Sequence, residues 1–437
     1  MNNITINDIY TGKPDAKDEI TFDGIDNFIR SFVTPNNLDF NKLIDGNNCF
    51  ITGYKGTGKT ALLFYLDDLL KDKDNSCCTS FIFFKDEYTD TRKHNMRSLS
   101  KRILSSITIG DNTQVNNTDF EYIWRWLFLK RIVSDNQEYN NGLFVNDNKW
   151  NNFKNLVDII KDPVNNKKTK IPSKIRLKFP LMKTECEVDF NKSKNDYSYL
   201  SFVELIDKAE NAFGSLKRTD IPYYIFVDEL EAYYGNEDIF YRDLYLIRDL
   251  LFTVKRFNEM FYRLSSKGLK IICSVRTEIL RAISRFIVSK ELNKITSGFS
   301  VAMQWNYSNT SSHLHPIIKV LLKRISISKN LNLDKDKDYL QIYQEWLPEN
   351  IQGIEPANYI LNNSWFKPRD IVRLLIAMQN SIANTKRKMT QEVFSYSQKQ
   401  YSIESLEEIK EEMKALYNPR EIDEIISCFN GFTTRFS

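Results

Sequence analysis

Eight residues near the start of the chain constrain the fold more than any other feature. Residues 53–60 read Gly-Tyr-Lys-Gly-Thr-Gly-Lys-Thr and match the phosphate-loop pattern G-x-x-x-x-G-K-[ST] at every fixed position. The whole chain has only 14 glycines, so their concentration here is unusual. An apolar run at 49–52 precedes the loop, and apolar residues recur at helical spacing over 61–70. A strand, a glycine-rich turn and a helix in this order are the setting that the motif needs.

The residue types of this loop indicate what it binds. Glycine lets the backbone curl so that successive N–H groups point at phosphate oxygens, and the helix that begins at Lys59 adds its positive dipole end. We expect Lys59 to contact the β- and γ-phosphates and to act in catalysis, and the Thr60 hydroxyl to ligate Mg²⁺. The predicted nucleotide contacts here are Gly53, Tyr54, Lys55, Gly56, Thr57, Gly58, Lys59, Thr60 and Ala61.

A pair of acidic residues follows a second apolar run. Residues 223–227 are continuously apolar, which is typical of a strand in a parallel sheet covered on both faces, and Asp228 and Glu229 come next. A carboxylate at such a strand end can hold Mg²⁺ opposite Thr60, so Asp228 is the second predicted metal ligand. Glu229 is placed to polarise an attacking water and is the predicted catalytic base, with Glu231 as a weaker alternative. Together with the phosphate loop, this pair indicates hydrolysis of a nucleoside triphosphate.

The remaining pattern predicts the fold class. Apolar runs predict further strands at 80–84, 269–275 and 299–305, and the chain reads as helical beyond about residue 310. The expected class is α/β: a P-loop NTPase three-layer sandwich with a parallel sheet, an inserted segment and a C-terminal all-helical domain. The predicted domains are an N-terminal lead-in at 1–45, an ATPase core at 46–305 and a helical lid at 306–437.

Residues 136–200 differ in composition and are interpreted as an insertion into the core. They are rich in Asn, Lys and Asp, and polar and apolar residues alternate at 174–178 and 185–189, which predicts a small hairpin. The basic run at 165–178 either contacts the phosphates of a nucleic acid or forms a solvated loop. Just before the insertion, Trp124 and Trp126 favour core packing over base stacking.

Arginines supply further candidates. Arg276 ends the strand at 269–275, where it either contacts the γ-phosphate or forms an ion pair with Glu278 or Asp228. A helix is expected over 239–266, and on one of its faces Arg242, Asp249, Arg256 and Arg263 repeat every seven residues. These arginines, with Arg248, are candidate arginine fingers, but a solvated helix face explains them equally well.

The composition of the chain indicates in which compartment the protein works and which kinds of partner it can bind. The 61 basic and 57 acidic residues leave a net charge of +4, which argues neither for nor against nucleic acid. The six cysteines show no C-x-x-C spacing, and we expect Cys49 and Cys273, which lie in apolar runs, to be buried. A signal-peptide pattern and an apolar run of 18 residues are both missing. A reduced, cytoplasmic protein with no membrane contact is expected.

Four motifs carry a resemblance to a known group. They are residues 53–60, Val-Asp-Glu-Leu-Glu at 227–231, Ser-Val-Arg-Thr-Glu-Ile at 274–279 and Lys-Pro-Arg-Asp-Ile-Val-Arg at 367–373. With them the chain resembles the AAA-like/STAND branch of P-loop ATPases, and more narrowly a poorly characterised family of stand-alone bacterial ATPases often associated with anti-phage defence. The resemblance implies that Arg369, with Arg373 in reserve, is a lid arginine that contacts the γ-phosphate. A sensor-type Asn at the end of the fourth strand, usual in the group, is absent from this sequence.

Three functions are compatible with these features. The leading one is a Mg²⁺-dependent ATPase that acts as a nucleotide-driven conformational switch, as a homo-oligomer or beside an effector protein. The alternative is a nucleic-acid-stimulated motor or loader that uses the insertion and the arginines to bind DNA or RNA. The third is a scaffold that holds ATP without turnover, against which the presence of Glu229 counts.

Overall fold

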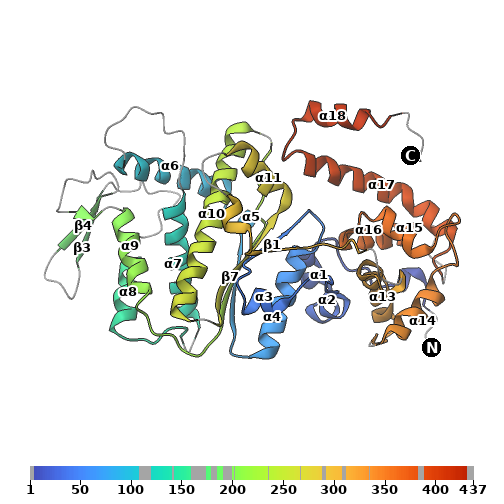
Figure 1. The fold of residues 1–437 in the computed structure, drawn as a ribbon, viewed down its shortest axis with the longest axis horizontal. Helices are drawn as coiled ribbons and strands as arrows, with labels where there is room; N and C mark the ends of the chain where they lie inside the picture. Colours follow the sequence, from blue (N-terminus) through green and yellow to red (C-terminus); the bar gives the residue numbers. More distant parts are fainter. Residues whose placement is uncertain are drawn as a thin grey trace.

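A five-stranded parallel sheet forms the centre of the molecule (Figure 1). The computed structural model describes residues 4–107, 120–139, 142–158, 174–178, 185–189, 199–200, 202–234, 236–265, 267–287, 292–307, 312–333, 335–381 and 388–430. The strands are β1 Phe50–Gly53, β2 Cys78–Phe83, β6 Tyr223–Asp228, β7 Leu269–Arg276 and β8 Ser300–Ala302. Their order is β2-β6-β7-β1-β8, and every neighbouring pair is parallel. This order is typical of AAA+ ATPases, and all five predicted strands are confirmed.

Both faces of the sheet are covered, which confirms the three-layer sandwich. The helices on one side include α6 Asp90–Ile107, α7 Glu121–Glu138, α8 Asn148–Asp158, α9 Phe202–Phe213 and α10 Glu237–Leu264. Successive side chains of a strand point to opposite faces, so Ile225 and Val227 pack into the core of this side. Tyr224 and Phe226 pack into the core of the other side, with α4 Lys59–Lys73 and the C-terminal helices.

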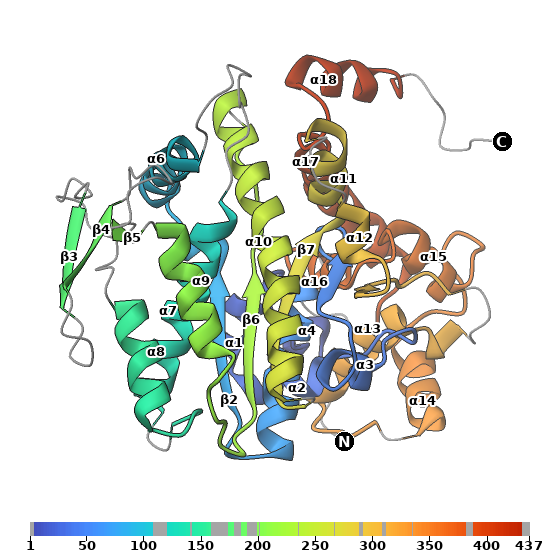
Figure 2. The same ribbon diagram turned by 60° about the vertical axis from the view of Figure 1, so that its left-hand side comes forward.

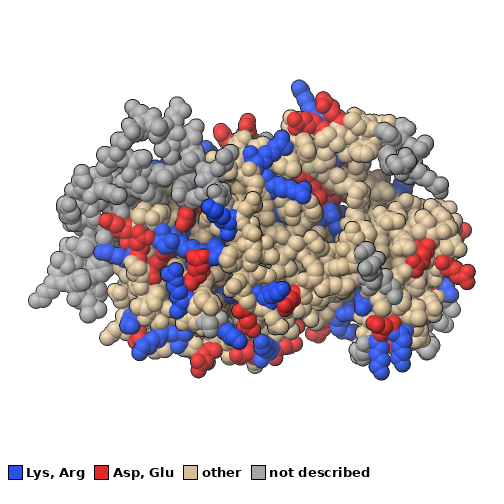
Figure 3. Space-filling model, viewed as in Figure 1, with Lys and Arg blue, Asp and Glu red and all other residues tan. Residues whose placement is uncertain are grey.

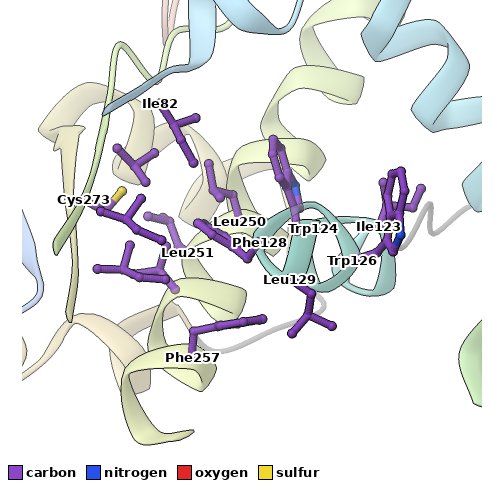
Figure 4. Close-up of a cluster of buried hydrophobic side chains, with 14 of the residues drawn as sticks. Ile82, Ile123, Trp124, Trp126, Phe128, Leu129, Leu250, Leu251, Phe257 and Cys273 are labelled. Atoms are coloured by element: carbon purple, nitrogen blue, oxygen red, sulfur yellow. The ribbon is translucent and has the colours of Figure 1, made fainter. Parts of the chain in front are cut away.

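The first core contains the predicted tryptophans. Trp124 and Trp126 on α7 are 2% and 1% exposed, and the indole N–H of Trp124 donates to the carbonyl of Leu246 at 2.9 Å. Figure 4 shows them in the same cluster as Leu250 of α10 and Cys273 of β7. The core-packing interpretation of these tryptophans is therefore confirmed, as is the burial of Cys273.

A small second sheet lies outside the central one. The hairpin of β3 Lys174–Lys178 and β4 Glu185–Asp189 is antiparallel, with Lys174 opposite Asp189, and β5 Tyr199–Leu200 joins β4 in parallel. The predicted hairpin is confirmed, and it stands apart from the central sheet (Figure 1). Residues 165–173 of the predicted basic run lie outside the described residues.

The C-terminal part is helical, as predicted. Its helices are α13 Pro316–Ser328, α14 Asp336–Trp346, α15 Pro356–Asn363, α16 Pro368–Gln379, α17 Gln391–Met413 and α18 Pro419–Ser427. The N-terminal helices are α1 Ala16–Asp23, α2 Ile25–Ser31 and α3 Phe40–Ile44; α1 packs against α4, and α2 packs against α13 of this helical part (Figure 2). None of the helices in the described part of the chain combines the length and the apolar character that a membrane span requires. The domain limits at 45 and 305 stay predictions.

The interpretation of the arginine repeat on α10 as a solvated face is wrong for its first half. Arg242 is 6% exposed and donates to Asp243, and Arg248 is 2% exposed and donates to Asp249. Neighbouring helices cover this part of α10, so its charges are buried, and buried charges require partners. Arg256, which is exposed, pairs with Glu210 of α9.

Candidate functional site

One cavity at the carboxyl end of the sheet brings most of the predicted site residues together. Its lining comes from the phosphate loop, the ends of β6 and β7, the N-terminal segment and the helical lid. The predicted residues that line it are Lys55, Gly56, Gly58, Lys59, Thr60, Ala61, Asp228, Glu229, Arg276 and Arg369. This is where polar side chains that follow parallel strands converge in open α/β sheets.

Gly53, Tyr54 and Thr57 do not line the cavity, but together with the glycines at 56 and 58 they set the conformation of the loop. Gly56 and Gly58 have φ angles of +81° and +87°, which favour glycine. A Cβ atom at Gly53 would lie 2.5 Å from the Thr57 hydroxyl oxygen, so a larger residue there would displace Thr57. The Thr57 hydroxyl donates to the Tyr54 carbonyl at 2.8 Å, which closes the turn.

Lys59 begins α4 and is 8% exposed. Its ammonium group donates to the carbonyls of Gly53 and Tyr54, at 2.9 Å each. Burial lowers the pKa of Lys59 to about 8, against the opposite effect of the Glu278 carboxylate. The ammonium group is buried and its partners are neutral carbonyls. A phosphate anion beside it would therefore be bound strongly, since a low dielectric constant strengthens the attraction between opposite charges.

Asp228 ends β6 and is 2% exposed. One carboxylate oxygen accepts a hydrogen bond from the Ser274 hydroxyl on the neighbouring strand β7. The other, Oδ2, is buried, and no residue in the described part of the chain hydrogen-bonds to it. A buried carboxylate oxygen without a donor carries a free-energy cost that a cation removes. Asp228 and Thr60, which line the same cavity, therefore fit Mg²⁺.

Ser274 is a functional candidate that sequence reasoning missed. β7 runs beside β6 with Cys273 opposite Val227, so the next residue, Ser274, stands beside Asp228. The available signal was a hydroxyl residue inside the otherwise apolar run at 271–275. This signal can be interpreted only when the strand order is known, because the pairing of β6 with β7 determines which residue lies beside Ser274.

Glu229 has two unusual properties. Its backbone φ is +60°, a left-handed conformation that residues other than glycine adopt rarely, and strain of this kind clusters at functional sites. Its Oε2 atom is buried without a hydrogen-bond partner among the described residues. Burial, helped by the negative charges of Asp86 and Asp228, raises the pKa of Glu229 to about 7, against the lowering effect of Lys17. A carboxylate with a pKa near neutrality suits a general base.

Arg276 lines the cavity and forms ion pairs on its rim. Its guanidinium donates to Glu231 and lies 3.9 Å from Glu278. The sequence offered Glu278 and Asp228 as ion-pair partners of Arg276, and the structure pairs Arg276 with Glu278. Glu231, the weaker candidate for the base, is also 3.8 Å from the ammonium of Lys85.

The lid arginines lie against the phosphate loop. The backbone N–H of Arg369 points at the Gly56 carbonyl at 3.4 Å, and its guanidinium donates to Glu408 of α17 at 2.8 Å and to the Pro14 carbonyl at 2.9 Å. Arg373, one turn further along α16, also donates to Glu408. Arg369 lines the cavity, whereas Arg373 is not among the residues that line it.

The N-terminal segment supplies a wall of the cavity that the sequence did not indicate. Phe28, Phe32 and Val33 line it beside the lid. The segment is fastened to the lid by a buried ion pair between Glu19 and Arg324, 3.1 Å apart. A polar stretch before the first strand contains no pattern that predicts this position, because only the packing of α13 against α2 creates it.

The strand order and the loop define the AAA+-like class of P-loop fold. A family model described as the FunZ-associated C-terminal helical domain matches residues 316–410, which run from α13 into α17. Among solved structures, the chain is similar to the Orc1 protein of Aeropyrum pernix in complex with DNA, with a TM-score of 0.33 and 10% identity over 89% of this chain and 74% of that chain. A search of curated proteins gave no match.

Proposed function

We propose that the chain is a Mg²⁺-dependent ATP hydrolase that acts as a nucleotide-driven conformational switch. The observation that carries this proposal is the convergence on one cavity of Lys59, Asp228 and Glu229. Two of the three present a buried carboxylate oxygen that lacks a described partner. A site built only to hold a phosphate anion gains nothing from two such carboxylates, whereas a site that binds a cation and activates water needs both.

The residues divide the work of hydrolysis. When bound by Thr60 and Asp228, Mg²⁺ supplies positive charge to the β- and γ-phosphates. Lys59 neutralises the same phosphates, and the loop N–H groups orient them. Glu229 accepts the proton of the attacking water, for which its pKa of about 7 is suited. Arg276 lines the cavity and stabilises the charge that develops on the γ-phosphate.

The lid gives this reaction a mechanical output. Arg369 belongs to the lid helix α16 and contacts both the phosphate loop and the N-terminal segment. Gain or loss of the γ-phosphate therefore changes the forces on the lid. We place the switch in the cytoplasm, as a homo-oligomer or with an effector protein, in antiviral defence; the motif resemblance at 53–60, 227–231, 274–279 and 367–373 supports this placement.

The alternative is a motor or loader stimulated by nucleic acid. On the face drawn in Figure 3, Lys and Arg side chains are interspersed with Asp and Glu. Binding of a phosphate backbone is favoured by a continuous basic surface, since affinity rises with each phosphate neutralised. This face therefore favours the switch.

Nucleotide binding and turnover by wild type and Lys59→Ala, with and without DNA or RNA, test the proposal. We expect wild type to bind and hydrolyse ATP in the presence of Mg²⁺, and Lys59→Ala to lose nucleotide binding. Normal binding by Lys59→Ala would contradict the phosphate-loop assignment. Stimulation of turnover by DNA or RNA that weakens steeply with salt would favour the motor or loader instead.

A further inference from the structure

The last turns of α17 carry three carboxylates that face the cations around the cavity. Glu408 accepts from Arg369 at 2.8 Å and also pairs with Arg373. The next two acidic residues on this face pair with lysines: Glu411 with Lys55, and Glu412 with Lys367 at 2.7 Å. Their spacing of three and four residues places them on one face of the helix.

Glu408 is the centre of this cluster. It is only 5% exposed, and a carboxylate so placed needs cationic partners to remain charged. Burial tends to raise the pKa of Glu408, but Arg369 and Arg373 outweigh it and hold the pKa below its usual value. Glu408 is therefore an anion bound by two arginines at the edge of the cavity.

Two of the cations in this cluster belong to the nucleotide site. Lys55 is part of the phosphate loop, and both Lys55 and Arg369 line the cavity. Lys55 lies 4.0 Å from Glu408 as well as pairing with Glu411, so α17 ties the loop to the lid. The phosphates of a nucleotide and the carboxylates of α17 are anions that attract the same two side chains.

The two ends of α17 differ in how they are held. Phe394 and Tyr401, in its first half, are 1% and 4% exposed and belong to the core of the lid. In its second half the contacts are mainly ionic, and Ile403 and Leu406 are 58% and 39% exposed. The second half can therefore move without unpacking the first.

We propose that the second half of α17 is a latch that competes with the nucleotide. Glu408 and Glu411 hold Arg369 and Lys55 when the phosphates are absent, and a bound triphosphate takes over both cations and releases residues 404–413. This inference rests on the proposed function, because it requires a triphosphate in the cavity. Because the latch and the nucleotide compete, a change that opens the latch strengthens nucleotide binding, at most by the factor by which closure of the latch had weakened it.

The affinity of a non-hydrolysable ATP analogue with Mg²⁺ tests the competition. We expect Glu408→Gln to bind the analogue about fivefold or more tightly than wild type, which is the lower end of typical coupling. Glu411→Gln should show a smaller gain in affinity, because the ion pair between Glu411 and Lys55 is partly exposed. Glu404→Gln is the matched control on the exposed side of the same helix and should bind as wild type does.

Hydrogen exchange of residues 404–413 provides the second measurement. The analogue should speed exchange there in wild type, and Glu408→Gln should exchange rapidly even without it. Unchanged or weaker binding by both Glu408→Gln and Glu411→Gln, or slower exchange with the analogue, would overturn the latch. Glu411 is exposed, so its variant keeps the comparison valid if Glu408→Gln does not fold. A wild-type protein that binds no nucleotide would overturn the proposed function as well.

Discussion

Gly56 of the phosphate loop and Arg369 of the lid are in direct contact. The backbone N–H of Arg369 lies 3.4 Å from the Gly56 carbonyl oxygen, and a Cβ atom at Gly56 would lie 3.3 Å from the Cβ of Arg369. The loop is the predicted phosphate site and α16 is a rigid helix of the lid. This contact is therefore a direct route by which phosphate binding can act on the lid.

Gly56→Ala should weaken nucleotide binding and lower stability. The φ of +81° costs a non-glycine residue about 1–2 kcal/mol, and the added methyl group also presses against Arg369. Gly298→Ala is the matched control, because Gly298 has a φ of +77° but no atom within 4 Å of the added Cβ. Both variants should melt at a lower temperature, whereas only Gly56→Ala should lose affinity for ATP. An equal loss of affinity in the two would show that the lid contact has no role.

Ser274→Ala should raise the Mg²⁺ concentration needed for half-maximal turnover. The substitution leaves Asp228, which is 2% exposed, without its donor, and a hydrogen bond to a charged group is worth about 1.5–3 kcal/mol. Turnover at limiting Mg²⁺ should fall about tenfold or more. Ser326→Ala removes a comparably buried hydroxyl that bonds only within α13, and its Mg²⁺ dependence should stay that of wild type. A matching Mg²⁺ curve for Ser274→Ala would exclude this role.

Turnover should increase as the pH rises through about 7. The Glu229 carboxyl must lose its proton to act as a base, and burial raises its pKa to about 7. The same shift has a consequence for stability. Because the folded pKa lies above the unfolded one, Glu229 contributes stability at low pH that is lost as the pH rises through 7. The melting temperature of Glu229→Gln relative to wild type should therefore climb between pH 5 and pH 8, and a constant difference would argue against this pKa.

Arg324→Met should impair both stability and nucleotide binding. Arg324 pairs with Glu19, which is 2% exposed, and breaking a buried pair by removing one partner costs about 3–5 kcal/mol. The pair fastens the N-terminal wall of the cavity to the lid, so affinity should fall too. Arg125→Met removes a partner of Glu210 far from the cavity lining, and it should lower the melting temperature without changing affinity per folded molecule. Unchanged affinity in Arg324→Met would show that the wall does not contact the nucleotide.

The sequence predicted what depends on local pattern. Long apolar runs such as 223–227 become buried strands, and the alternation at 174–178 and 185–189 becomes a hairpin, because burial and pleating act over a few residues. Which side of α10 is buried could not be predicted. The seven-residue repeat that begins at Arg242 does not reveal that neighbouring helices cover this part of α10. Ser274 and Phe28 were missed for the same reason: their places at the site result from strand order and helix packing.

Single-turnover hydrolysis of bound ATP by wild type and Glu229→Gln tests the central claim most directly. Both proteins should bind ATP with similar affinity, because Lys59, Thr60 and the loop are unchanged in the variant. Loss of a general base lowers the rate of the chemical step by about 10²–10⁴-fold, so hydrolysis should nearly stop in Glu229→Gln. Equal rates of hydrolysis in the two proteins, with equal ATP bound, would contradict the assignment of Glu229 as the base.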